Sequence, residues 1–137
     1  MRLSSALVRR AVGRGWRKRC PHCGRGRLFE GWVRHLGSCA VCGLVYERNP
    51  GDTWAFTILF DRLPLGLMVA LVYFGIFRAS ALLGVVAFVV LGAAFIISTP
   101  NRWGVGIALH YVSRVVWPDP VDPLPSTPAR SDEDAIA

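Results

Sequence analysis

The sequence predicts a pair of membrane helices joined as a hairpin, with a small β domain before them and an amphipathic helix after them. Three observations lead to this prediction: two Cys-x-x-Cys pairs, two long uncharged apolar runs, and an uneven distribution of charge along the chain. Of the 137 residues, 53% are hydrophobic, and the formal net charge is +7. One soluble domain is the usual expectation at this length, but the segregation of charged, apolar and proline-rich stretches favours a small membrane protein.

Residues 1–17 form a basic N-terminal arm. The first 19 residues contain no acid, and their basic residues are Arg2, Arg9, Arg10, Arg14, Arg17, Lys18 and Arg19. Arg9 and Arg10 interrupt the apolar residues, so a cleaved secretory signal is not expected, although the lack of acids also fits a mitochondrial transit peptide. The arm suits either anionic lipid or nucleic acid. A membrane nearby favours lipid, so nucleic acid is not the partner we expect.

Residues 18–52 contain all four cysteines, in a first knuckle (residues 20–24, Cys-Pro-His-Cys-Gly) and a second knuckle (residues 39–43, Cys-Ala-Val-Cys-Gly). The glycine after each pair can adopt a positive φ that turns backbone N–H groups toward the sulfurs. Two such pairs at this interval are typical of one tetrahedral site, here formed by Cys20, Cys23, Cys39 and Cys42. The sequence therefore predicts a zinc-ribbon-like β minidomain. Its zinc site has no open position for a catalytic water, which favours a non-enzymatic protein.

Two other uses of the four cysteines stay open at this point. Such knuckles can hold iron in the manner of rubredoxin, and in an oxidising compartment the thiols can pair as disulfides. His22 and His35 lie near the cysteines but are not expected to be ligands, because four sulfurs complete the shell. About thirty residues bury too little surface to fold alone, so a metal has to supply the missing stability.

Residues 63–100 are predicted to form the membrane hairpin. Leu63 to Phe77 is uncharged, and a second uncharged run from Ala79 to Thr99 spans about 31 Å as a helix. The hairpin turn falls near Arg78. Small residues should let the two helices approach closely: Gly66, Ala70, Gly84, Gly92 and Ala93. Upstream, Asn49-Pro50-Gly51-Asp52 predicts a turn, and the aromatic-rich residues 53–62 form an interfacial segment.

Asp61 and Arg62 are a candidate ion pair at the membrane boundary. We expect Asp61 to cap a helix that begins near Pro64, with Arg62 reaching the headgroup phosphates. The alternative places both residues inside the first span, where ionisable side chains are by default functional.

The distribution of basic residues predicts the orientation in the membrane. Most Lys and Arg residues precede Asp52, and few lie at the hairpin turn or after the second span. Basic flanks stay in the cytoplasm. The expected location is therefore the inner (plasma) membrane, multi-pass, with both termini and the cysteines in the reducing cytoplasm.

Residues 101–117 are predicted to form an amphipathic interfacial helix. Its apolar residues recur at helical spacing: Val105, Ala108, Leu109, Val112 and Val116. Pro118 should end it. Residues 118–137 then form a disordered, proline-rich acidic tail.

Several of these features together resemble family 983 of the domains of unknown function, which are short bacterial membrane proteins. The resemblance covers about residues 18–114 and rests on Cys-Pro-His-Cys-Gly-Arg-Gly-Arg-Leu-Phe, the second knuckle, the Pro-Gly-Asp step, the apolar hairpin and the late Gly-Val-Gly-Ile-Ala-Leu-His segment. Membership implies zinc-ribbon-like knuckles and two membrane helices, with no established reaction. Genes of the family lie near those for cytochrome oxidase assembly in some bacteria, which implies a role in building a membrane complex.

Two functional hypotheses follow. In the first, a structural zinc module on a membrane hairpin docks an unknown membrane or cytoplasmic protein, such as respiratory-complex assembly machinery. In the second, the thiolates exchange metal or electrons, as in a redox or metal-handling protein. The metal that the cysteines hold, zinc or iron, separates the two.

Overall fold

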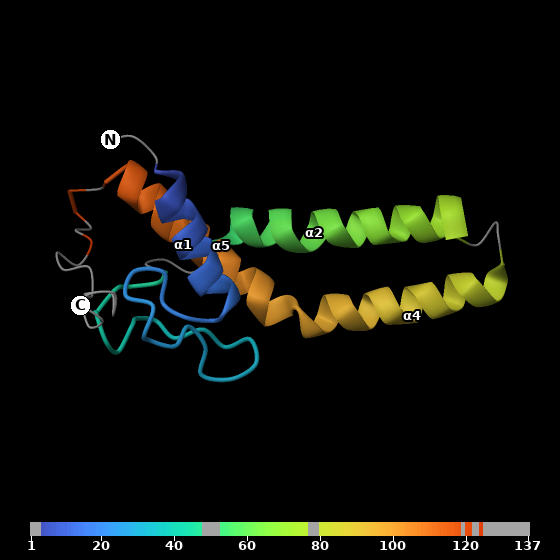
Figure 1. Ribbon diagram of the computed structural model, residues 1–137, viewed down its shortest axis with the longest axis horizontal. Coiled ribbons are helices and arrows are strands. Elements are labelled where there is room, and N and C mark those ends of the chain that lie inside the picture. Colours follow the sequence, from blue (N-terminus) through green and yellow to red (C-terminus); the bar gives the residue numbers. More distant parts are fainter. Residues whose placement is uncertain (1–3, 48–52, 77–79, 119, 122–123, 125–137) are drawn as a thin grey trace, which may run out of the picture.

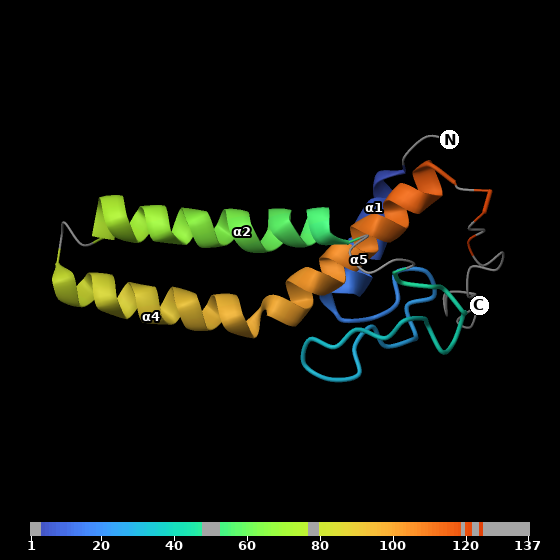
Figure 2. The same ribbon diagram turned by 180° about the vertical axis from the view of Figure 1, so that it is seen from behind.

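The computed structural model describes residues 4–47, 53–76, 80–118, 120, 121 and 124. Its helices are α1 (Ser5–Trp16), α2 (Trp54–Leu71), the short π-helical η1 (Val72–Ile76), α4 (Ala81–Ile97) and α5 (Thr99–Val116). Figures 1 and 2 show two parts. The head, residues 4–47 with α5, packs α1 and the cysteine loops against α5. The arms, α2 with η1 and α4, extend side by side from the head in opposite chain directions.

The predicted β minidomain is not present. In the described residues of the head the chain forms no strand, only three isolated antiparallel bridges: Arg19 with Arg27, Phe29 with His35, and Ser38 with Val45. The reason is local, because much of the backbone hydrogen bonding between residues 20 and 46 closes knuckle turns or single bridge pairs. Segments this short between turns cannot build a ladder. The fold prediction is therefore wrong for the N-terminal part, which is a set of turns covered by two helices.

Helix α2 begins ten residues earlier than predicted. It starts at Trp54, with Thr53 as the preceding residue, and Pro64 lies inside it. The prediction of a separate interfacial segment at residues 53–62, and of a helix start near Pro64, is wrong. Proline removes one backbone hydrogen bond within a helix, but the apolar residues that precede Asp61 and those that follow Arg62 favour one long helix through Pro64.

One helix of the described residues is long and apolar enough to cross a membrane, Trp54–Gly75, with a mean hydropathy of 1.8. The joined pair α4 and α5 qualifies as a second only if both are counted as one span, because they are bent by 49° at their junction. Length and composition therefore allow one or two spans. Pro100, in the first turn of α5, accounts for the bend, since it has no N–H for the preceding helix and its ring crowds the preceding turn.

Helix α5 does not lie free as an amphipathic surface helix. It is the central element of the head, and its buried residues are Pro100, Arg102, Gly104, Val105, Gly106, Ile107, Ala108, Tyr111 and Val112. The prediction for residues 101–117 is therefore correct about a helix that ends before Pro118 and wrong about its environment. The apolar stripe of α5 faces α1 and the cysteine loops instead of a headgroup layer.

Helix α1 crosses α5 through a contact between two glycines. A Cβ atom on Gly15 would collide with the backbone of Gly104, and one on Gly104 would collide with the carbonyl group of Gly15. The two helix backbones can therefore lie this close only because both positions are glycine. This contact fixes α1, which the sequence presents only as a basic arm, onto the helix that supports the cysteine loops.

The arms, in contrast, make little contact with each other. A Cβ atom added to Gly66 or Gly92 would meet no atom within 4 Å. The prediction of a close helix approach is therefore wrong at Gly66 and Gly92, whereas Gly84, near the beginning of α4, is buried. The predicted hairpin turn near Arg78, the turn at residues 49–52 and almost all of the C-terminal tail lie outside the described residues.

Candidate metal centre

The two knuckles fold as the sequence predicts. Gly24 and Gly43 both have a φ of +73°, in the left-handed region that favours glycine. Each glycine N–H closes its turn on the carbonyl of the first cysteine, at 2.8 Å from Gly24 to Cys20 and 2.9 Å from Gly43 to Cys39. The two turns therefore have matching backbone conformations.

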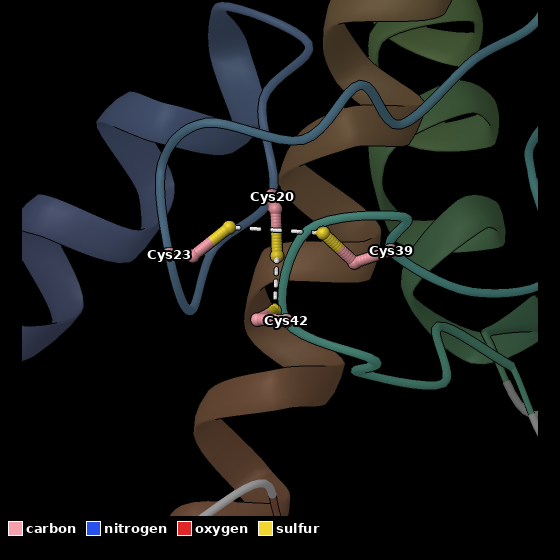
Figure 3. Close-up of side chains that lie close together, drawn as sticks. All are labelled: Cys20, Cys23, Cys39 and Cys42. Carbon is pink, nitrogen blue, oxygen red and sulfur yellow. Dashed lines mark hydrogen bonds between the residues drawn. The ribbon is translucent and has the colours of Figure 1, made fainter. Parts of the chain in front are cut away.

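The turns bring all four sulfur atoms together, as Figure 3 shows. The Sγ atoms of Cys20 and Cys42 are 3.7 Å apart, those of Cys23 and Cys39 are 3.6 Å apart, and all four lie within 4.8 Å of one another. Sulfurs bound at about 2.3 Å to one tetrahedral ion are separated by about 3.8 Å. The four cysteines are free thiols and lie close enough together to bind one metal ion.

Backbone N–H groups surround the sulfurs. Those of His22 and Cys23 donate to Cys20, and those of Val41 and Cys42 donate to Cys39. Such bonds stabilise the thiolate form that binds metal.

The pKa values of the thiols reflect two opposing effects. Burial raises the pKa of Cys20 to about 11, which the N–H donors offset only in part. Burial also tends to raise the pKa of Cys39. There, hydrogen bonds from the N–H groups of Cys42 and Val41 and from the Tyr46 hydroxyl outweigh burial and lower the pKa to about 6. Burial raises the pKa of Cys42 well above its usual range. A cation at the centre would therefore have to displace protons from Cys20 and Cys42.

The sulfurs lie inside the core of the head. Cys20, Cys23 and Cys39 are buried and Cys42 is half-buried. They pack with residues from the loops and from α5: Leu28, Phe29, Leu44, Tyr46, Ile107, Ala108, Tyr111 and Val112. A Cβ atom on Gly26 would collide with the sulfur of Cys39, so glycine is required there to leave room for the cluster. The centre is therefore part of the core and not a site at the rim.

Two arginines from the helices hold the loops that carry the cysteines. Nη1 of Arg14, on α1, donates to the carbonyl oxygens of His22 (2.7 Å) and Pro21 (3.2 Å) in the first knuckle. Nη1 of Arg114, on α5, donates to the carbonyl oxygen of Val45 (2.6 Å), just after the second knuckle. The loop that carries each knuckle is thereby connected to one helix of the head.

Neither nearby histidine joins the sulfurs. The ring of His22 contacts the ring of Tyr111 edge-on, with the centroids 5.9 Å apart. His35 lies 3.0 Å from a carboxylate oxygen of Glu47 through its Nε2. In the part of the chain that the structure describes, the group of side chains close enough together to hold a metal ion is the four cysteines.

Asp61 and Arg62 do not form an ion pair with each other. Asp61, in the middle of α2, pairs with Arg102 on α5: Nε and Nη2 of Arg102 lie 3.0 Å and 2.9 Å from Oδ1. Nε1 of Trp103 donates to Oδ2 at 2.9 Å. Arg62 is exposed. The prediction that Asp61 caps a helix is wrong, because the helix begins at Trp54.

Arg102 also joins the bend between α4 and α5. Its Nη1 donates to the carbonyl oxygen of Phe95 (2.6 Å) and to the Ser98 hydroxyl, and its guanidinium lies 3.8 Å from the centre of the Phe95 ring. Its Nη2 donates to the Thr99 hydroxyl at 3.3 Å. One side chain therefore satisfies groups at the end of α4 and pairs with a carboxylate on α2.

Sequence reasoning missed Arg102, Trp103, Arg14 and Arg114 as structural partners. The partner of Asp61 lies 41 residues away, and no local spacing indicates it. The available signal in the sequence was that Arg102 is the first charged residue after the long uncharged run that begins at Ala79.

The resemblance to family 983 of the domains of unknown function is not tested by the fold, and it stays a prediction. A scan of the chain against protein-family models finds no match, and comparisons with curated proteins and with solved structures find none.

Proposed function

We propose that this chain is a non-enzymatic membrane protein whose four cysteines hold one structural zinc ion. The zinc keeps the head folded, and the head presents a rigid surface for a protein partner. The observation that carries this proposal is the enclosure of four mutually close sulfurs in the core of the head, directly against α5.

The ligand set supports a structural ion. Four thiolates complete a tetrahedral shell, and a catalytic zinc keeps one position open for water or substrate. Zn²⁺ has no redox chemistry. Its binding free energy, about 10–16 kcal/mol in zinc-finger peptides, would stabilise the folded loops. Cys20, Cys23, Cys39 and Cys42 would hold it, and the knuckle N–H groups would share the charge of the sulfurs.

The arms support insertion in a membrane. Large apolar side chains of both arms are exposed, among them Leu67, Tyr73, Leu82 and Val89 at 61–74% of their surface. Soluble proteins rarely expose contiguous apolar surface of this extent. Insertion of α2 and of the bent α4–α5 pair in the inner membrane, with both termini cytoplasmic, follows the excess of basic residues in the head.

The partner is proposed from the resemblance alone. If the chain belongs to family 983, its head would dock a component of a respiratory-complex assembly machinery. The alternative function, in which the thiolates exchange metal or electrons, rests on the same four sulfurs, because a rubredoxin-like iron site uses the same ligands.

The test is metal analysis of the full chain purified from membranes in mild detergent. We expect one equivalent of zinc and a colourless protein that resists carbonate extraction from its membrane. Iron with visible absorption that bleaches on reduction would favour the alternative. Absence of bound metal would overturn the metal proposal, and extraction by carbonate would overturn membrane insertion.

A further inference from the structure

Helix α1 ends in a turn that normally requires glycine. The N–H of Lys18 bonds to the carbonyl of Gly15 (2.8 Å), and the N–H of Arg19 bonds to that of Arg14 (2.9 Å), the paired bonds of a Schellman motif. The residue after the cap of this motif adopts the left-handed conformation, and here it is Lys18, with a φ of +59°. No other non-glycine residue in the described part of the chain has a positive φ.

A lysine is an unfavourable choice for this backbone position. Its Cβ crowds the following carbonyl in the left-handed conformation, and glycine avoids that contact. A cation near a helix C-terminus does interact favourably with the helix dipole, but Arg17 and Arg19 already supply positive charge there. A residue held in a strained conformation often marks a function, and the ammonium group is what glycine lacks.

The charges of this turn are available to a ligand. Arg17, Lys18 and Arg19 are all exposed. Within the part of the chain that the structure describes, the side chains of Arg17 and Lys18 form no hydrogen bond or ion pair, and Arg19 donates only to the carbonyl oxygen of Arg25. No acidic residue precedes Glu30 in the sequence to neutralise them.

The turn lies where the apolar arm α4 ends. Nδ2 of Asn101, in the first turn of α5, donates to the carbonyl oxygen of Trp16 at 2.8 Å. Figure 1 shows the C-terminal end of α1 beside the beginning of α5. The Trp16 side chain is 50% exposed. An exposed indole beside cations, at the end of an apolar helix, matches the composition of membrane–water interfaces.

We propose that Trp16, Arg17, Lys18 and Arg19 form a binding site for the headgroups of anionic phospholipids. This proposal rests on the proposed membrane insertion, because insertion of α4 would place the end of that helix, and the turn beside it, at the depth of the lipid headgroups. The cations attract the lipid phosphate, and the indole occupies the interface beside it. Each basic residue near an anionic membrane strengthens binding by about 1 kcal/mol, which is about five-fold in affinity.

The experiment compares phosphatidylglycerol with phosphatidylcholine as ligands of the full, metal-loaded chain in neutral detergent micelles, with bound lipid quantified by native mass spectrometry. We expect Lys18→Gly to weaken phosphatidylglycerol binding about five-fold and to leave phosphatidylcholine binding unchanged. The same substitution should raise the thermal midpoint by about 2–4 °C, because it relieves the left-handed strain. Lys18→Arg should keep the affinity.

Arg10→Gln is the matched control, because Arg10 is an exposed cation on the same helix about two turns from the site. Its affinity for phosphatidylglycerol should stay within two-fold of wild type. Equal affinity of wild type and Lys18→Gly for phosphatidylglycerol would overturn the proposal. So would tighter binding of short duplex DNA than of phosphatidylglycerol, with the same dependence on Lys18, because the patch would then be a nucleic-acid surface.

Incorporation into pure phosphatidylcholine vesicles separates this inference from the proposed function. A chain that inserts there but shows no Lys18-dependent preference for phosphatidylglycerol refutes the headgroup site and leaves membrane insertion standing. A chain that fails to insert but still binds phosphatidylglycerol through Lys18 refutes insertion and retains the headgroup site.

Discussion

The head and the arms are stabilised by opposite means. In the head, side chains such as Leu28, Leu44 and Tyr46 are at most 1% exposed, and they surround the cysteine sulfurs. In the arms, Tyr73 and Leu82 are more than 70% exposed, and the two helices make little contact. The head therefore encloses its own core, whereas the arms leave their large apolar side chains exposed. Helix α5 belongs to the head but continues α4, so it joins the two parts.

The largest expected effect comes from breaking the head at its centre with Cys39→Ser. Removing one thiolate should abolish stoichiometric metal binding and unfold the loops, because the bridges and turns that remain cannot hold them without the ion. Metal analysis should find well under one equivalent, and near-UV circular dichroism of the head should be lost. Far-UV helicity from α2 and α4 should persist.

Ala40→Ser is the control for this substitution, since Ala40 is exposed in the same turn and is not a ligand. It should keep a full equivalent of metal. Full occupancy in Cys39→Ser would refute the four-cysteine centre.

A smaller effect is expected where the head meets the arms. Arg102→Ala should cost about 3–5 kcal/mol in the free energy of unfolding, because it leaves the carboxylate of Asp61 without its cation in a largely dehydrated place. The side chains of Arg102 and Asp61 are 10% and 22% exposed, so solvent screens the pair only in part. Equilibrium unfolding in mixed micelles measures the change.

Arg62→Ala should change the same free energy by less than about 0.5 kcal/mol, because the Arg62 side chain is exposed. An equal cost for both substitutions would show that the pairing of Asp61 with Arg102 is not the one that stabilises the junction.

The metal affinity of the head should depend steeply on pH. The raised pKa of Cys20, about 11, and of Cys42, higher still, keep both thiols protonated at pH 7, whereas Cys39, with a pKa of about 6, is mostly ionised. A divalent ion must displace at least two protons, so its apparent affinity should fall about 100-fold as the pH drops from 8 to 7. Competition with a chromophoric chelator measures it. A pH-independent affinity would contradict the thiol ligands.

The smallest effects are expected from a glycine-to-alanine substitution made once in the head and once in the arms. Gly104→Ala should destabilise the head by about 1–3 kcal/mol, because the new methyl group collides with the carbonyl group of Gly15. Gly66→Ala should be neutral or stabilising by about 0.5–1 kcal/mol, since the methyl group meets open space and alanine favours a helix. Thermal unfolding of both variants gives the signs. A loss of stability in Gly66→Ala would indicate close helix packing in the arms.

The local features of this molecule could be predicted from its sequence. The knuckles are encoded within five residues each, including the glycines at positive φ, and the ends of α4 and α5 follow from Pro100 and Pro118. The long apolar helices of the arms could be predicted from composition. The predicted start of α2 is ten residues too late, because the prediction places it near Pro64, which lies inside the helix.

The parts that could not be predicted depend on contacts between distant segments. The burial of α5 and the crossing of Gly15 with Gly104 require α1 to fold back over the helix that follows the arms. The pairing of Asp61 with Arg102 likewise joins different helices. The adjacent Arg62 was the nearer candidate in sequence, but neighbouring helix positions point in different directions, so adjacency gave the wrong partner.

Hydrogen exchange of the metal-loaded chain in phospholipid nanodiscs, before and after removal of the metal by a chelator, compares the stability of the head directly with that of the arms. In the proposed function, a four-thiolate metal centre stabilises the head and the bilayer covers the arms. We expect chelation to abolish protection in residues 4–47 and in α5 beyond Gly104, while α2 and α4 keep theirs. Unchanged protection in the head, or equal loss in the head and the arms, would contradict it.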